Sequence, residues 1–170
     1  MKKLVFILTT VVALSVSQFA TAQKTIVDVA VGNEDFSTLV AALKAADLVS
    51  ALQGDGPFTV FAPTNDAFGK VDASTLNSLL EPKNKSTLSG ILTYHVVAGK
   101  LEAKDVVAAL KKGKGMVTLK TLNGQDIVVK QKDGKKWLKD QNGNYSEIVM
   151  TDVKGSNGVI HVIDSVVMPI

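Results

Sequence analysis

Two hydrophobic periods divide the chain. From Asn33 to Gly113 the apolar residues recur every three or four positions, as they do along one face of a helix. Together with the capping residues, this pattern predicts helices that begin near Asn33 and then occupy residues 47–54, 72–80, 86–94 and 102–112. Gly113 follows the last helix and is expected to take the left-handed conformation that ends many helices.

From Met116 onward the pattern changes to alternation and β-branched residues, which predicts strands. Turn signals separate these strands at Asn123-Gly124, Asp133-Gly134, Asn142-Gly143 and Asn157-Gly158, and indicate a meander. One further strand is predicted at residues 58–62, inside the helical half, so the sheet must draw on both ends of the chain. The predicted class is α+β, not a series of βαβ units.

Residues 1–22 have the three parts of a signal peptide. Lys2 and Lys3 are followed by an apolar stretch over residues 4–16 and by the small-residue site Ala20-Thr21-Ala22. We therefore expect cleavage near Ala22-Gln23 and a secreted or periplasmic mature domain over residues 23–170. The apolar stretch is shorter than the roughly 20 residues that span a bilayer. No later segment comes close, so no membrane span is expected in the mature chain.

Composition excludes several kinds of site. The chain has no cysteine, which excludes disulfides and thiolate metal sites. Of its 19 basic residues, all lysine, 17 remain after residues 1–22 against 16 acidic residues, a net charge of +1. Without arginine, bidentate recognition of phosphates and bases is disfavoured, so no nucleic-acid partner is expected. The sequence also lacks the serine-elbow, phosphate-loop, dinucleotide and H-E-x-x-H motifs. We expect no enzyme activity, no catalytic residue, no metal site and no cofactor.

The segment TVFAPTNDAF, residues 59–68, is typical of a strand that turns directly into a helix. Alternation places Thr59 and Phe61 on one face of the strand, and Pro63 ends the ladder because it has no N–H donor. Thr64 is then a natural N-cap, and Asp66 lies in the first turn, where the helix dipole favours an anion. Each residue has a structural role, which we favour over a catalytic role for Asp66.

Two further motifs contain both histidines of the chain. His95 follows Tyr94 at the end of a predicted helix, and His161 stands in an apolar run within NGVIHVIDSVVMP, residues 157–169. An imidazole among apolar residues needs a hydrogen-bond partner. We therefore favour a satisfied core histidine in both places over an acid–base pair of either histidine with Asp66.

The three segments, in this order and at this spacing, resemble the fasciclin domain, a family of adhesion and interaction modules, over about residues 24–170. The resemblance implies an α+β fold in which N-terminal helices pack on a folded β-sheet wedge formed mainly by the C-terminal half. It also implies a non-catalytic, secreted adhesion or protein-binding function. The motif residues expected to be structural are Thr59, Phe61, Pro63, Thr64, Asp66, Phe68, Asn157, Gly158, His161, Asp164 and Pro169.

The resemblance also implies a partner site. In animal members of the family, tyrosine-rich surface around the Tyr-His pair and an Asp-Ile pair before the closing strand are linked to integrin binding. Here Tyr94 and His95 occupy the first position, and Asp152 and Val153 the second, with Val153 in place of isoleucine. We expect a protein or cell-surface partner bound near these four residues, with self-association as one possible form.

A lysine-rich hairpin offers a second interpretation of the surface. Around Trp137, the only tryptophan, stand Lys130, Lys132, Lys135, Lys136 and Lys139. Basic residues beside an aromatic ring could hold an acidic polysaccharide or an anionic cell surface. Lysines also protect exposed edge strands from pairing with other chains, and we favour this structural interpretation.

The segment after the hairpin has part of a calcium-loop pattern. Asp140, Asn142 and Asn144 have the spacing that opens such a loop, but Tyr145 stands where the sharp turn requires glycine. A polar hairpin turn is therefore expected at this place.

Overall fold

The computed structural model describes residues 24–170, and the signal peptide predicted for residues 1–22 lies outside them. The helical segments are α1 (Ile26–Val31), η1 (Glu34–Phe36), α2 (Ser37–Ala45), α3 (Val49–Gln53), α4 (Asn65–Gly69), α5 (Ala73–Leu80), η2 (Pro82–Asn84), α6 (Lys85–Tyr94) and α7 (Ala103–Lys112). The strands are β1 (Phe58–Pro63), β2 (Val96–Ala98), β3 (Met116–Lys120), β4 (Asp126–Lys132), β5 (Lys135–Lys139), β6 (Tyr145–Gly155) and β7 (Gly158–Ile163).

The strands form one seven-stranded sheet in the order β2-β1-β7-β6-β5-β4-β3. Strands β3 to β7 follow one another as an antiparallel meander, which confirms the prediction from the turn signals. β1 lies parallel to β7 in this sheet, with Phe58 opposite Gly158 and Pro63 opposite Ile163. The sheet thus joins both ends of the chain as expected, through a parallel pair that the sequence analysis did not predict.

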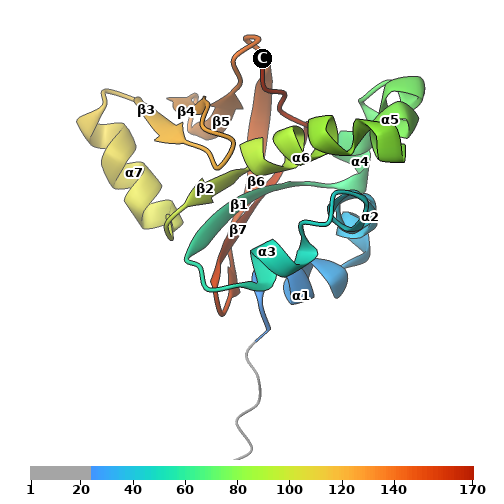
Figure 1. Ribbon diagram of the computed structural model, residues 1–170. Helices are drawn as coiled ribbons and strands as arrows, with labels where there is room; N and C mark the ends of the chain where they lie inside the picture. The colour runs from blue at the N-terminus through green and yellow to red at the C-terminus, as the bar shows by residue number, and fades with distance from the viewer. Residues whose placement is uncertain (1–23) are drawn as a thin grey trace, which may run out of the picture.

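β6 is shared by the two halves of the folded sheet. Its residues 145–147 pair with β5, and its pairs with β7 run from Ile148 to Gly155. A single bridge between Val97 and Thr121 brings the two outer ends of the sheet together. Helices α1 to α6 gather beside β1 and β7, whereas α7 lies beside β3 (Figure 1). The predicted α+β fold, with N-terminal helices on a wedge-shaped sheet, is confirmed.

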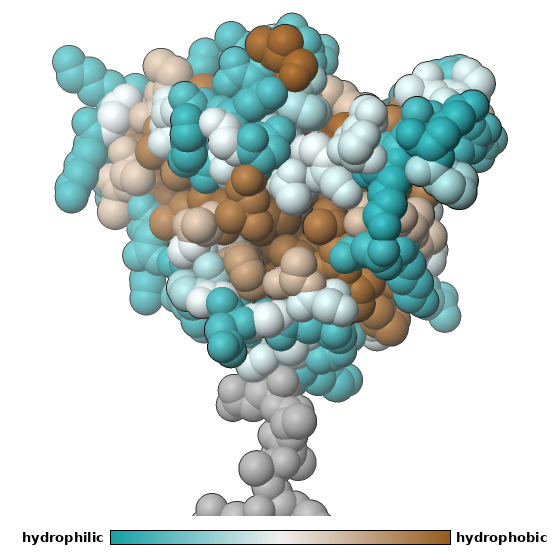
Figure 2. All heavy atoms as spheres, viewed as in Figure 1, coloured by the Kyte–Doolittle hydropathy of each residue, from teal (hydrophilic) through white to brown (hydrophobic). Residues whose placement is uncertain are grey.

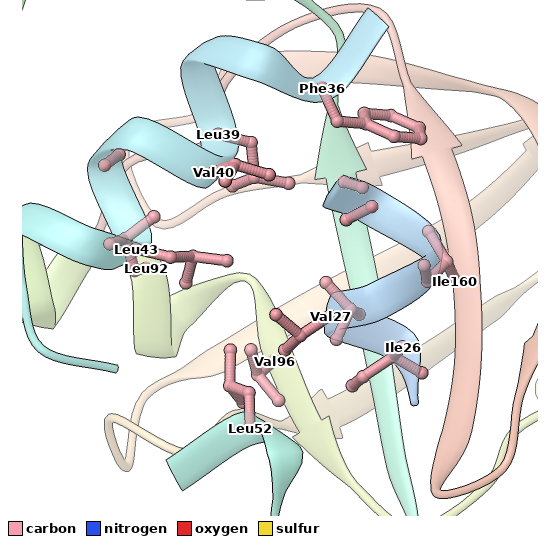
Figure 3. Close-up of a cluster of buried hydrophobic side chains, with 14 of the residues drawn as sticks. Ile26, Val27, Phe36, Leu39, Val40, Leu43, Leu52, Leu92, Val96 and Ile160 are labelled. Carbon is pink, nitrogen blue, oxygen red and sulfur yellow. The ribbon is translucent and has the colours of Figure 1, made fainter. Parts of the chain in front are cut away.

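Two buried clusters lie on opposite faces of the sheet because alternate residues of β1 and β7 point to opposite sides. Val60 and Ala62 belong to the cluster under the N-terminal helices, whereas Phe61 belongs to the cluster under α7 and the meander. Figure 3 shows apolar side chains of the first cluster converging from the helices around Val96 and Ile160. In Figure 2, apolar atoms gather in the middle of the face between α3 and α6, with polar atoms around them.

Two features of the helices differ from the sequence analysis. The helix α1 was missed, although Thr25 and Asp28 form a capping box at its start. Gly113 has φ −88°, so the left-handed residues are the next two, Lys114 and Gly115. Glycine is needed at position 113 because a Cβ there would lie 1.9 Å from the carbonyl oxygen of Met116.

The last turn also differs from its prediction by one residue. The loop between β6 and β7 is Ser156-Asn157, and Gly158 already belongs to β7, opposite Gly155. A Cβ on Gly158 would lie 2.2 Å from the carbonyl oxygen of Phe58. Gly158 therefore allows β1 to approach β7, and does not serve the turn.

Candidate functional site

The first motif joins β1 to α4 and also holds α2. Thr64 caps α4 by accepting a hydrogen bond from the Ala67 N–H at 3.2 Å, as predicted. The amide of Asn65 donates to the Glu34 carbonyl oxygen at 2.8 Å, and its oxygen accepts from the Thr38 N–H at 3.0 Å. Asp66 is exposed in the first turn of α4. The sequence analysis missed the role of Asn65, which ties the starts of two helices together.

Thr59, at the start of the motif, is a buried residue of β1. Its hydroxyl donates to the Gly99 carbonyl oxygen at 2.7 Å and accepts from the Leu101 N–H at 2.9 Å. Phe61 and Phe68 are buried in the two clusters, on opposite sides of the sheet. These side chains hold segments of the fold in place.

The Tyr94-His95 pair is inside the protein. Tyr94 has no exposed surface and donates its hydroxyl proton to the Asp126 carbonyl oxygen at 3.0 Å. Burial, with the charge of Asp140, raises the pKa of Tyr94 to about 12. The expectation that Tyr94 and His95 form a contact surface is wrong for the folded chain, because neither side chain can reach a partner.

Both histidines are neutral core residues with two hydrogen bonds each, as the favoured interpretation predicted. In His95, Nδ1–H donates to the Ile91 carbonyl oxygen at 2.8 Å, and Nε2 accepts from the Val167 N–H at 3.3 Å. Burial lowers the pKa of His95 to about 4. In His161, Nε2–H donates to the Leu101 carbonyl oxygen at 2.7 Å, and Nδ1 accepts from Asp152 N–H at 3.4 Å. Burial lowers the pKa of His161 too.

Asp152 occupies an irregular position in β6. The strand register shifts between Met150 and Val153, and Asp152 between them has φ 62°, in the left-handed region. Its carboxylate accepts a hydrogen bond from the Ala103 N–H at 2.7 Å, so it satisfies a donor at the start of α7. Val153 packs against the cluster under the N-terminal helices, whereas Tyr94 belongs to the other cluster. The structure therefore does not bring the two proposed pairs together.

The closing motif is a junction. Asn157 accepts from the Ile26 N–H at 3.0 Å and donates to the carbonyl oxygens of Leu52 and Gly54, both at 2.8 Å. One side chain thus fixes α1 and the end of α3 to the turn between β6 and β7. Within residues 24–170, every buried side-chain nitrogen or oxygen atom has a hydrogen-bond partner.

Asp164 holds β6 to the end of β7. It accepts from the Glu147 N–H at 2.8 Å and forms an ion pair with Lys70 at 3.1 Å. Burial opposes ionisation of Asp164, but the hydrogen bond from Glu147 and the ammonium of Lys70 outweigh it, and the pKa is lowered. Pro169 lies near the C-terminus, where its carbonyl oxygen accepts from Asn142 at 3.4 Å.

The polar turn after β5 also fastens the C-terminal segment. The Asp140 carboxylate accepts from the Asn144 N–H at 2.8 Å and from the Met168 N–H at 3.2 Å. Gly143 takes φ 89° in this turn. Asp140 is buried and serves hydrogen bonds within the chain, as expected of a hairpin turn.

The lysine-rich hairpin is not at an edge of the sheet. β4 and β5 each lie between two neighbours, and the edge strands are β2 and β3. The favoured interpretation, protection of an edge strand, is therefore wrong. Lys136 also differs from the other hairpin lysines, because it lies opposite Gln131 on the face that carries the buried Leu138 and Val129.

The outward face of β3 to β6 presents a row of cross-strand neighbours. Met116 lies opposite Lys130, Lys130 opposite Trp137, and Trp137 opposite Glu147. Two rows flank it, one with Lys132 and Lys135 and the other with Lys139 and Tyr145. A groove of about 630 Å³ follows this face; its lining includes Lys114, Met116, Lys130, Lys132, Trp137 and Tyr145. We call it the β3–β6 groove.

Each aromatic ring of the β3–β6 groove has an ammonium group beside it. Lys130 Nζ lies 5.9 Å from the Tyr145 ring centroid, and Lys135 Nζ lies 5.9 Å from the Trp137 ring centroid. Lys135 also pairs with Glu147 at 2.9 Å. The sequence analysis missed Lys114, Met116 and Tyr145 as parts of this surface. Strict alternation from Trp137 and the strand pairing place Met116 and Tyr145 on its face.

Comparison with known proteins places these features in context. The chain matches the fasciclin domain over residues 34–169. It is 53% identical over 155 residues to protein sll1483 of Synechocystis, covering 91% of this chain and 79% of that protein. It is 35% identical over 154 residues to the cell surface glycolipoprotein MPB83 of Mycobacterium bovis, covering 87% of this chain and 62% of that protein.

A solved structure shares the fold. A fasciclin domain pair from the insect cell adhesion molecule fasciclin I superposes with a TM-score of 0.73 at 22% identity, covering 84% of this chain and 50% of that chain. Within residues 24–170, no helix has the length and apolar character needed to cross a membrane.

Proposed function

The chain belongs to the fasciclin domain family, and from this premise we propose that it is an exported, non-catalytic adhesion module that binds a protein on a cell surface or a second copy of itself. The observation that carries the proposal is the use of the motif side chains. His95 and His161 have both ring nitrogens hydrogen-bonded inside the core, and Asp164 is committed to Lys70 and Glu147. Acid–base chemistry would require these groups to be accessible to a substrate.

Export is part of the proposal and is supported by the signal-peptide pattern in the sequence and by the similarity to a cell surface protein. Adhesion is supported by the shared family and by the likeness to a cell adhesion molecule. The secreted or periplasmic location can be tested by fractionating cells and sequencing the N-terminus of the exported chain, which is expected to begin at Gln23.

We place the contact with a protein partner on the irregular part of β6, near Asp152 and Val153. Val149 and Met150 are 56% and 57% exposed there, an unusual exposure for two adjacent apolar residues of a strand. β5 pairs only with residues 145–147 of β6, so the backbone from Ile148 onward is not paired on that side with any strand of residues 24–170. An extended backbone with apolar side chains can add a strand from another chain.

Bead aggregation tests this proposal. Beads that carry the exported chain are expected to clump, or to attach to surfaces coated with cell-envelope proteins, and the double variant V149K/M150K is expected to lose this adhesion. The matched control V31K/L122K changes two similarly exposed apolar residues elsewhere and is expected to retain it. Wild-type beads that neither clump nor attach would contradict the proposal.

A second candidate function, binding of an anionic polymer by the β3–β6 groove, is favoured by one observation. The hairpin lysines lie on interior strands, where protection of an edge does not explain them. Light scattering of the exported chain at low and high salt distinguishes the two functions. Self-association through Val149 and Met150 should change little with salt, whereas contacts made by lysine charge should weaken.

A further inference from the structure

We propose that the β3–β6 groove is a binding site for a linear acidic polysaccharide that carries uronate carboxylates. This proposal rests on the second candidate function and names its ligand class. The groove crosses four neighbouring strands, a width of about 14 Å at the usual strand spacing. It is an open surface channel, a shape that suits a segment of a polymer passing across the sheet.

The charge of the groove favours an anion. Lys114, Lys130 and Lys132 line it, and none of them forms an ion pair with a carboxylate in residues 24–170. Asp133 is the acidic residue in the lining, and Lys135 is already paired with Glu147. The lining thus carries an excess of positive charge that no neighbouring side chain neutralises, and a carboxylate of a bound polymer would supply the missing partner.

The aromatic residues favour a sugar ring over a simple anion. Trp137 is half-buried and Tyr145 is 49% exposed, so each ring leaves part of its surface open at the groove. One face of a pyranose ring carries mainly C–H groups, and covering the indole with it removes apolar surface of both from water. Met116, 47% exposed, extends the same apolar floor on β3.

The groove places groups that could bind a carboxylate next to groups that could bind a sugar ring, so one sugar unit could contact both. Lys130 lies opposite Trp137 on the adjacent strand. The Lys130 ammonium lies 5.9 Å from the Tyr145 ring centroid, and the Lys135 ammonium lies 5.9 Å from the Trp137 ring centroid. A uronate residue has a carboxylate attached directly to its ring, so a ring stacked on Trp137 would bring its charge to Lys130, the cross-strand neighbour of Trp137 that has no carboxylate partner in residues 24–170. Lysine suits this task because a single flexible charge can follow a polymer without the fixed geometry of a guanidinium.

Fluorescence of Trp137 tests the proposal without a label, since the chain has no other tryptophan. Titration of the exported chain with polygalacturonate is expected to shift or quench the emission to saturation, and neutral dextran is expected to leave it unchanged. The double variant K130Q/K132Q keeps the reporter and is expected to bind about tenfold more weakly, since it loses two of the unneutralised charges. Raising the salt from about 0.05 to about 0.5 M should weaken binding by the wild type.

The matched control is K24Q/K44Q, which removes the same charge from two exposed lysines outside the groove and is expected to bind as the wild type does. Retained affinity in K130Q/K132Q, or no response to polygalacturonate, would overturn the proposal. Equal affinity for oligothymidylate would also overturn it, because the groove would then attract any polyanion without recognising a sugar. None of these results bears on bead adhesion through Val149 and Met150, so the two proposals fail independently.

Discussion

Two regions of this molecule, the family motifs and the β3–β6 groove, differ in how their polar groups are used. Among the motif residues, Asn157, His161 and Asp164 are bound to backbone or side-chain partners on at least two other segments each. In the β3–β6 groove, Lys114, Lys130 and Lys132 have no carboxylate partner in the described chain. The residues that identify the family are therefore those that hold the fold together, and the surface whose lysines lack a carboxylate partner carries none of them.

The largest expected effect comes from emptying the core at Tyr94. Replacing Tyr94 by alanine should lower the free energy of unfolding by about 4 kcal/mol, because the side chain is fully buried. Y94F removes only the hydrogen bond to the Asp126 carbonyl and should cost about 1 kcal/mol. Urea denaturation measures both variants. A Y94A protein as stable as the wild type would show that Tyr94 does not help to hold the fold together.

The next effect is the response to pH of the buried histidines. His95 has a pKa of about 4 in the folded chain, below its ordinary value of 6.5, because burial disfavours the charged ring. The unfolded chain therefore takes up the proton first, and stability falls as the pH drops from 6.5 towards 4, by about 3 kcal/mol for this group. Urea denaturation at a series of pH values measures the slope.

The control for this response is H95Q, whose side chain does not titrate. The slope between pH 6.5 and 4.5 should become shallower in H95Q, leaving the contribution of His161, whose pKa is lowered in the same direction. The carboxylates with lowered pKa values do not contribute to this slope, because their stabilisation is lost only below about pH 4.5. An identical slope in H95Q would show that His95 is not held neutral by the core.

Asn157 tests the junction at the closing turn. N157A removes one acceptor and two donor contacts, and should lower the free energy of unfolding by about 2 kcal/mol, because the Ile26 N–H and the carbonyl oxygens of Leu52 and Gly54 lose their partner. Ser156, the exposed neighbour in the same turn, provides the control S156A, with an expected change close to zero. Equal effects of the two changes would contradict the role given to Asn157.

The smallest expected effect is in the β3–β6 groove. K130Q/K132Q should change the free energy of unfolding by less than about 0.5 kcal/mol, because neither lysine is paired with a carboxylate. Thermal unfolding of this variant beside the wild type measures the change. A loss above about 1 kcal/mol would show that the hairpin lysines are structural, and would remove the contrast between the motif residues and the groove.

Local features of the fold were readable from the sequence, but the partners of its strands were not. The helical period, the cap Thr64 and the Asp133-Gly134 turn depend on neighbours within a few residues, and the structure has them as predicted. The pairing of β1 with β7 joins residues about a hundred positions apart, and no periodicity specifies such a partner. Glycine is needed at position 158 because β1 and β7 lie close together there. The turn signal at Asn157-Gly158 does not reveal this reason.

The candidate site shows the same limit. Tyr94 is buried because strands of the meander, some thirty residues further along the chain, pack over the end of α6. The lysine hairpin is not at an edge because β3 pairs with β4 on one side of it and β6 pairs with β5 on the other. Chemistry read from side-chain type alone, such as lysines around a tryptophan, was retained. Position in the sheet excluded the protection of an edge strand.

Mechanical load applied at the lysine hairpin would reach the rest of the sheet through the shared strand β6. Residues 145–147 of β6 pair with β5, and the rest of β6, from Ile148 to Gly155, pairs with β7. A pull on the lysine hairpin therefore reaches β7 through β6. Because β6 and β7 are antiparallel and joined by the loop Ser156-Asn157, a pull that separates Ile148 from Ile163 would open the pairs between these strands one after another. A load carried from the groove to the end of β7 would therefore unzip the β6–β7 hairpin from its open end towards the loop.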